Sequence, residues 1–72
     1  MKRVTTAKID TAKAAWLIEG HSARACLAAM PMLARDGIRE YARTDDPGVL
    51  RDYLVVLAGL ALAALERLDG DA

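Results

Sequence analysis

The side chains in this sequence that come first as candidates for chemistry are His21, Cys26, Asp45 and Asp46, but their spacing does not form a site. His21 and Cys26 are five residues apart, so on one helix they point about 140° apart and cannot hold the same metal ion. Asp45 and Asp46 directly precede Pro47, where they are better explained as helix caps than as a catalytic carboxylate pair. The sequence contains no nucleophile–base arrangement, glycine-rich phosphate loop or metal motif. We therefore predict no catalytic residue, no cofactor, no metal site and no enzymatic activity.

A row of basic residues is the remaining candidate for binding. The net charge is zero, but residues 1–43 carry eight Lys or Arg against four Asp or Glu, and residues 44–72 carry two against six. On one long helix a basic stripe would lie opposite Trp16, and its members are Lys13, Arg24, Arg35 and Arg39. Two interpretations remain open: the stripe binds the phosphates of nucleic acid or an acidic partner, or it is a solvated face with local ion pairs. No aromatic residue is interleaved with these bases, so nucleic-acid binding stays an alternative.

The short chain limits the core that it can build. With 72 residues it forms a single domain, whose core supplies only a few kcal/mol unless a disulfide, a metal or oligomerisation adds to it. A single cysteine excludes an internal disulfide, and 54% of the residues are hydrophobic. We therefore predict a homo-oligomer.

Composition also suggests where the protein works. The N-terminus lacks the apolar run of a signal peptide, and we expect a cytoplasmic protein. The excess of arginine over lysine and the high alanine content are typical of a GC-rich bacterial genome.

The elements that must position these residues are helices, because fifteen alanines and ten leucines favour helix throughout. A first helix is predicted over about residues 10–36, capped by Asp10 and preceded by a flexible arm over residues 1–8. Apolar residues recur on one face of it, and this face continues beyond residue 36: Ile9, Trp16, Ala23, Leu27, Met30, Ala34, Ile38 and Tyr41.

Pro31 interrupts this pattern without shifting its phase. Either the helix bends there and continues, or it ends and Pro31 starts a new helix. The unbroken phase favours a kinked or continuous helix. Gly37 can then close the helix, which leaves residues 38–43 as a short connecting helix or a continuation.

A second helix is predicted over about residues 47–68, with Pro47 in its first turn. Its central part, residues 53–65, holds thirteen residues without a charge. At ~1.5 Å per residue this part spans roughly 20 Å, less than the ~30 Å hydrocarbon core of a membrane, so we predict no membrane span. The two helices would pack as a helical hairpin around a core of Trp16, Leu27, Met30, Leu50, Tyr53, Leu54, Leu57, Leu60 and Leu68.

Apolar residues on the charged side of the second helix do not fit a simple hairpin. Val55 and Leu62 lie there with Gly59 between them, and Gly59 and Ala63 form a small-residue pair that permits a close helix approach. We predict that Val55, Gly59, Leu62 and Ala63 form an interface with another copy or another protein.

These expectations give one overall hypothesis. The chain is an all-α helical hairpin that assembles as a homodimeric four-helix bundle or a larger helical oligomer. It acts as a small non-enzymatic protein–protein interaction module, such as a regulator, an adaptor or a chaperone-like subunit. Its partners are itself and another protein.

An alternative comes from the first half of the chain. The arm over residues 3–9, the helix after it, Gly20-His21-Ser22 and the next helix together resemble a ribbon-helix-helix DNA-binding domain over about residues 3–42. The resemblance implies that the arm pairs with its symmetry mate as a β-ribbon that enters the major groove. It also implies an antitoxin-like regulator, whose C-terminal helix over residues 47–68 binds a partner.

Overall fold

Three helices make up the fold in the computed structural model, which describes residues 2–70 and the side chains of residues 4–70. They are α1 (Lys2–Ile18), α2 (Ala23–Thr44) and α3 (Pro47–Gly70). The all-α prediction is confirmed, and residues 2–70 contain no strand. The predicted arm is therefore helical over residues 2–8, and the predicted tail is helical as far as Gly70; Met1 and residues 71–72 lie outside the described residues.

The predicted helix over residues 10–36 is wrong, because the chain turns at residues 19–22. Gly20 adopts a left-handed conformation with φ of 74°, which ends α1 without the steric conflict of a Cβ atom. The Ser22 side chain then accepts a hydrogen bond from the Ala25 backbone N–H at 3.1 Å and caps α2. Gly20 thus ends α1, and Ser22, two residues later, caps α2. The apolar residues keep the same helical spacing across this turn.

We predict that Gly20→Ala destabilises this turn. Nothing lies within 4 Å of a Cβ atom built at Gly20, so the cost is that of the left-handed conformation alone, about 1–2 kcal/mol. Urea unfolding followed by circular dichroism measures it. Gly70→Ala is the matched control, since a Cβ atom at Gly70 also meets nothing within 4 Å and φ there is not positive. An unchanged stability of the Gly20→Ala variant would contradict the role assigned to this turn.

α2 runs through Pro31 and Gly37, as a continuous helix from Ala23 to Thr44. Pro31 and Leu27 are both exposed, so water can bond the Leu27 carbonyl that the proline leaves without an N–H donor. Gly37 does not end the helix; it is buried, and a Cβ atom there would lie 2.9 Å from Cγ of Tyr53. Residues 38–43 therefore belong to α2 rather than to a separate connecting helix.

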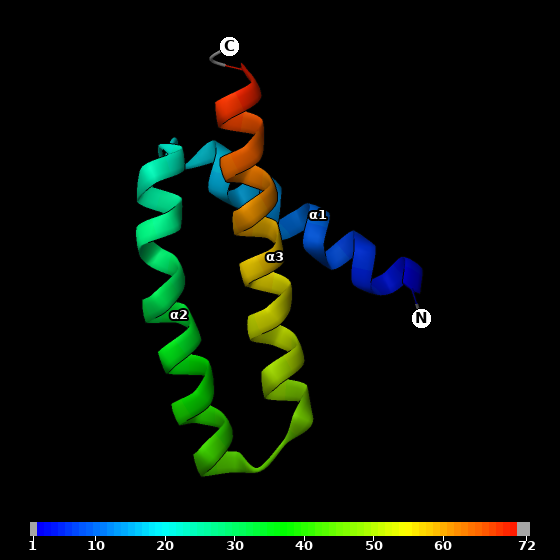
Figure 1. The fold of residues 1–72 in the computed structure, drawn as a ribbon. Helices are drawn as coiled ribbons and strands as arrows, with labels where there is room; N and C mark the ends of the chain where they lie inside the picture. Colours follow the sequence, from blue (N-terminus) through cyan, green and yellow to red (C-terminus); the bar gives the residue numbers. More distant parts are fainter. Residues whose placement is uncertain (1, 71–72) are drawn as a thin grey trace.

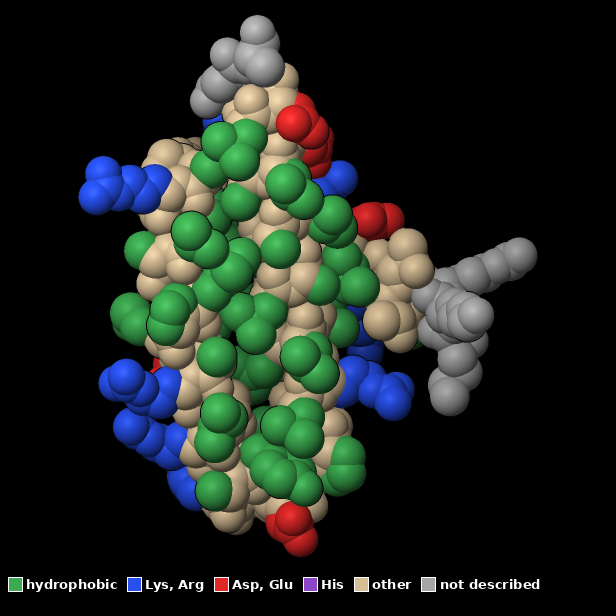
Figure 2. All heavy atoms as spheres, in the orientation of Figure 1, with side chains coloured by type: hydrophobic (Ala, Val, Ile, Leu, Met, Phe, Trp, Pro, Cys, Tyr) green, Lys and Arg blue, Asp and Glu red, His purple; other side chains and the backbone are tan. Residues whose placement is uncertain are grey.

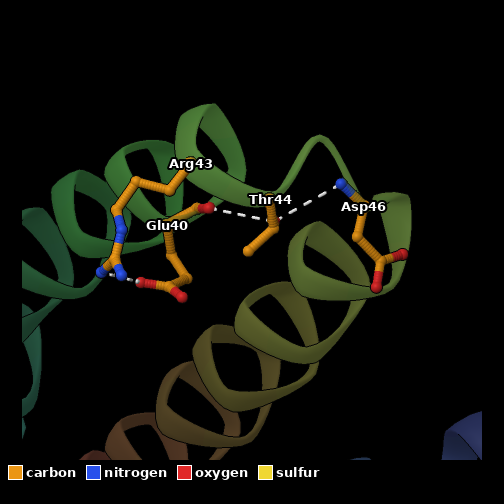
Figure 3. A network of polar contacts seen from close by, with 4 residues as sticks. All are labelled: Glu40, Arg43, Thr44 and Asp46. Atoms are coloured by element: carbon orange, nitrogen blue, oxygen red, sulfur yellow. Dashed lines mark hydrogen bonds and ion pairs between the residues drawn. The ribbon is translucent and has the colours of Figure 1, made fainter.

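The boundary between α2 and α3 lies at the predicted residues. Asp45 is left-handed with φ of 51°, and its N–H donates to the Tyr41 carbonyl at 2.7 Å. The Asp46 carboxylate accepts from the Gly48 N–H at 2.9 Å, as a helix cap does. Figure 3 shows the contacts that brace this turn, in which Thr44 donates to the Glu40 carbonyl at 3.0 Å and accepts from the Asp46 N–H at 3.4 Å. Glu40 also pairs with Arg43 at 3.3 Å.

α3 is the element on which the other two helices pack. It contacts both α1 and α2, whereas α1 and α2 do not pack against each other within residues 2–70. Figure 1 shows α2 and α3 side by side and antiparallel, with α1 crossing behind α3 and projecting away from it. The molecule is flat and long, with Cα extents of 42 × 27 × 15 Å.

The core of this single chain is small. Leu60, Cys26 and Ala63 are the fully buried hydrophobic residues among those described. Of the other predicted core residues, five are half-buried: Trp16, Met30, Leu50, Tyr53 and Leu57. The remaining three, Leu27, Leu54 and Leu68, are between 58% and 66% exposed, so their assignment to the core is wrong for a single chain.

Candidate interaction surface

The predicted interface strip on α3 faces α1 of the same chain at Gly59. A Cβ atom at Gly59 would lie 2.6 Å from Cβ of Ala12 and 2.7 Å from the Lys13 backbone nitrogen. Gly59 and Ala63 are buried, so within this fold they cannot also meet a partner. The close approach that Gly59 predicts is present, but α1 makes it. Val55 is half-buried and Leu62 is 41% exposed, so this strip is only partly covered.

Two polar contacts fasten α1 to the C-terminal half of α3. Arg67 donates from Nη2 to the Leu17 carbonyl at 2.8 Å, which places a cation at the negative end of α1. Lys13 pairs with Glu66, with Nζ 3.0 Å from Oε2. Nε of Arg67 is buried and has no hydrogen-bond partner among the described residues.

The side chains with reactive groups stay apart in the fold. His21 lies against the Trp16 ring, with centroids 5.3 Å apart and the planes tilted by 57°, and its Nε2 is 2.9 Å from Oε2 of Glu19. Cys26 is buried and unpaired. Within residues 2–70 no three His, Cys, Asp or Glu side chains gather where they could hold a metal ion.

Exposed apolar side chains line the surface that α2 and α3 share and reach, at Leu54, the flank of α3 that borders α1. Five aliphatic side chains are between 54% and 68% exposed there, and we call this set the open face: Leu27, Ile38, Leu54, Leu65 and Leu68. Residues eleven apart lie within about 20° of each other on a helix, and this spacing aligns Leu27 with Ile38 on α2 and Leu54 with Leu65 on α3. Figure 2 shows hydrophobic side chains along and between α2 and α3, with charged side chains at the edges.

A groove lies between α2 and α3 at one end of the open face, between residues 23–30 and residues 61–68. Its volume is about 520 Å³, and its apolar lining includes Ala23, Leu27, Met30, Ala61, Leu65 and Leu68. A second groove, of about 480 Å³, lies on the other flank of α3, where Thr5 and Ile9 of α1 oppose Leu50, Leu54 and Val55. α3 thus borders one apolar groove along its N-terminal half and another along its C-terminal half.

The predicted basic stripe is divided by the turn at residues 19–22. Lys13 lies on α1 and pairs with Glu66, whereas Arg24, Arg35 and Arg39 are exposed on α2. No ion pair involves these three arginines in the part of the chain that the structure describes. The predicted local ion pairs of this stripe are therefore not formed, and the arginines span about 22 Å of helix.

α3 also has the length and composition of a helix that could cross a membrane. It has 24 residues, its most apolar window has a mean hydropathy of 1.8, and 22% of that window is buried within the molecule. The prediction of no membrane span used only the thirteen uncharged residues, and the observed length of the helix removes that argument. Core helices of soluble proteins can meet the same criteria.

Comparisons with protein families, with curated proteins and with solved structures find no match for this chain. The sequence does contain a signal for the open face: Leu54, Ala58, Ala61, Leu65 and Leu68 follow one another at spacings of four, three, four and three residues, as in the seam of a coiled coil.

Proposed function

We propose that this protein is a small non-enzymatic protein–protein interaction module that pairs with a second copy of itself through the open face. In this assembly α2 and α3 of two copies form a homodimeric four-helix bundle. The observation that carries the proposal is the row of three exposed leucines on α3, Leu54, Leu65 and Leu68, beside an apolar groove. Contiguous apolar surface of this kind on a small protein is typical of interaction sites.

The solvent-exposed area of the chain is large enough to support an interface with a second copy. The chain exposes 5389 Å², whereas a folded monomer of 7.7 kDa is expected to expose about 4,300 Å². The excess of about 1,000 Å² is close to the ~800 Å² that each partner buries in a standard protein–protein interface. Part of the excess comes from the flat shape, with its shortest Cα extent of 15 Å, which leaves one side of α3 without a neighbour.

Sedimentation equilibrium of the wild-type chain at micromolar concentration tests the proposal. We expect twice the 7.7 kDa mass of one chain and an unfolding midpoint that rises with protein concentration, because association stabilises only the folded state. A stable monomer over this concentration range would overturn the dimer.

The apolar composition of α3 also suggests a lipid surface as a binding partner of the open face. Co-sedimentation with vesicles of neutral and of anionic phospholipid separates the two cases. A monomer that pellets with vesicles would assign the open face to membranes, whereas a dimer that stays in the supernatant supports the proposal.

A second candidate function is binding of nucleic acid by the exposed edge of α2, favoured by its three unpaired arginines, Arg24, Arg35 and Arg39. This candidate predicts that the wild type retards duplex DNA or RNA at low salt and loses this binding as salt rises. The variant R24A/R35A/R39A would abolish the retardation. Absence of retardation at low salt excludes this candidate. A ribbon-helix-helix arrangement receives no support, because residues 3–9, which would form the ribbon, belong to α1.

A further inference from the structure

We infer that the two copies pair with their α3 helices antiparallel, about a two-fold axis that passes between Ala58 and Ala61, and that each Arg51 lies beside Asp69 of the second copy. The inference rests on the proposed dimer through the open face. It adds the direction of the paired helices, their register and the charged contacts that select them.

The spacing of the apolar residues Leu54, Ala58, Ala61 and Leu65 fits antiparallel pairing of the two α3 helices. Leu54 and Leu65 lie at equal distances on either side of the midpoint between Ala58 and Ala61. In an antiparallel two-fold pair, a residue before the midpoint meets the residue equally far beyond it on the other copy. Each Leu54 then lies beside Leu65 of the second copy, and the alanines meet at the centre, where their small side chains allow the helices to approach closely.

The charges beside the seam favour the same direction. Arg51 and Asp69 are eighteen residues apart, which is five turns of an α-helix, so they lie on the same edge of α3. Both are exposed, and neither forms an ion pair within the described part of the chain. Antiparallel pairing brings this edge of one copy against the same edge of the second copy and places Arg51 opposite Asp69 twice. Parallel two-fold pairing puts the two copies of this edge on opposite sides of the seam, where Arg51 meets neither Asp69 nor the other Arg51.

The other charged groups towards the end of α3 are already engaged elsewhere. Glu66 pairs with Lys13, and Arg67 donates to the Leu17 carbonyl, so both serve the contact with α1. Asp52 lies within about 20° of Gly59 on α3, on the flank that meets α1. Arg51 and Asp69 therefore remain as the charges that flank the open side of α3. Opposite charges at the two ends of one edge make that edge complementary to itself only when the second copy is reversed.

Charge reversal tests the register. We expect R51E and D69R each to raise the dimer dissociation constant about tenfold, because each change turns two attractive contacts into repulsive ones. The double variant R51E/D69R restores both pairs and should return to within about threefold of the wild type. Both single changes place a favourable charge near an end of α3, so a loss of dimer would not come from a weakened helix. A double variant as weak as the product of the two single effects would overturn the register.

Disulfide trapping provides a second measurement, in a Cys26→Ala background. Chains carrying L54C are mixed with chains carrying L65C and oxidised. We expect a disulfide between the two kinds of chain and little within either kind, since antiparallel pairing places the two Leu54 positions about 16 Å apart along the helix, beyond the reach of a disulfide. Efficient L54C–L54C trapping would overturn the antiparallel direction while leaving the dimer standing. A monomeric wild type would instead overturn the proposed function itself.

Discussion

Leu65→Asp is expected to convert the proposed dimer into monomers. Leu65 is 54% exposed in the single chain, so an aspartate there costs the monomer little. In the proposed dimer the same change would remove a buried leucine twice and place two carboxylates in an apolar interface. The lost burial alone amounts to about 2 kcal/mol per leucine, and desolvation of the charges adds to it, so the dissociation constant should rise about a thousandfold or more.

Sedimentation equilibrium measures this change, and Val4→Asp is its matched control. Val4 is 60% exposed and lies on α1, away from the open face, so the control introduces the same charge on a surface of similar exposure. We expect the control to dimerise like the wild type. Equal dissociation of both variants would show that charge in general, rather than the open face, governs association.

Gly59→Ala is expected to separate α1 from α3. The added methyl group would stand 2.6 Å from Cβ of Ala12 and 2.7 Å from the Lys13 backbone nitrogen, and backbone cannot move aside as a flexible side chain can. Overpacking of this kind costs about 1–3 kcal/mol. Alanine in place of glycine also favours the helix by about 1 kcal/mol, so the expected net loss is up to about 2 kcal/mol, and Gly59→Val should lose more.

Two readouts distinguish release of α1 from general unfolding. Urea unfolding gives the free-energy change, and the emission of the single tryptophan, Trp16 on α1, should shift to longer wavelength when α1 leaves α3. Gly70→Ala is the control, because its Cβ atom meets nothing. A Gly59→Ala variant that is more stable than the wild type, with unchanged emission, would contradict the close contact at Gly59.

Local signals in the sequence located the boundary between α2 and α3 but not the ends of α1 or the start of α2. Asp46 and Pro47 mark the start of α3, and Pro31 lies in a helix that continues, as its unbroken phase indicated. The end of α1 was missed because Trp16 and Ala23 are seven residues apart, a spacing that keeps one helical face aligned whether or not the helix is interrupted. The capping residues Gly20 and Ser22 end α1 and start α2. Apolar periodicity cannot detect such a break when the apolar residues on both sides keep the same helical spacing.

That missed turn accounts for the error in the candidate site. With one helix over residues 10–36 the strip at Gly59 had no partner within the chain, so it was assigned to another molecule. Once α1 is a separate helix, it covers Gly59 and Ala63, and the uncovered side of α3 becomes the one that carries Leu54 and Leu65. The small residues at Gly59 and Ala63 correctly predicted a close helix contact. Which helix makes that contact depends on where the chain turns, and the turn was not predicted.

Because α1 packs only on α3 within the described residues, the helices are expected to fold in a definite order. α2 and α3 are joined by two residues, so their contacts close a short loop and can form early. α1 meets α3 across most of the chain length, through contacts such as Leu17 with Arg67, and it gains no support from α2. We therefore expect α2 and α3 to form first and α1 to dock last. In the native protein the amide hydrogens of α1 should be the least protected from exchange with solvent.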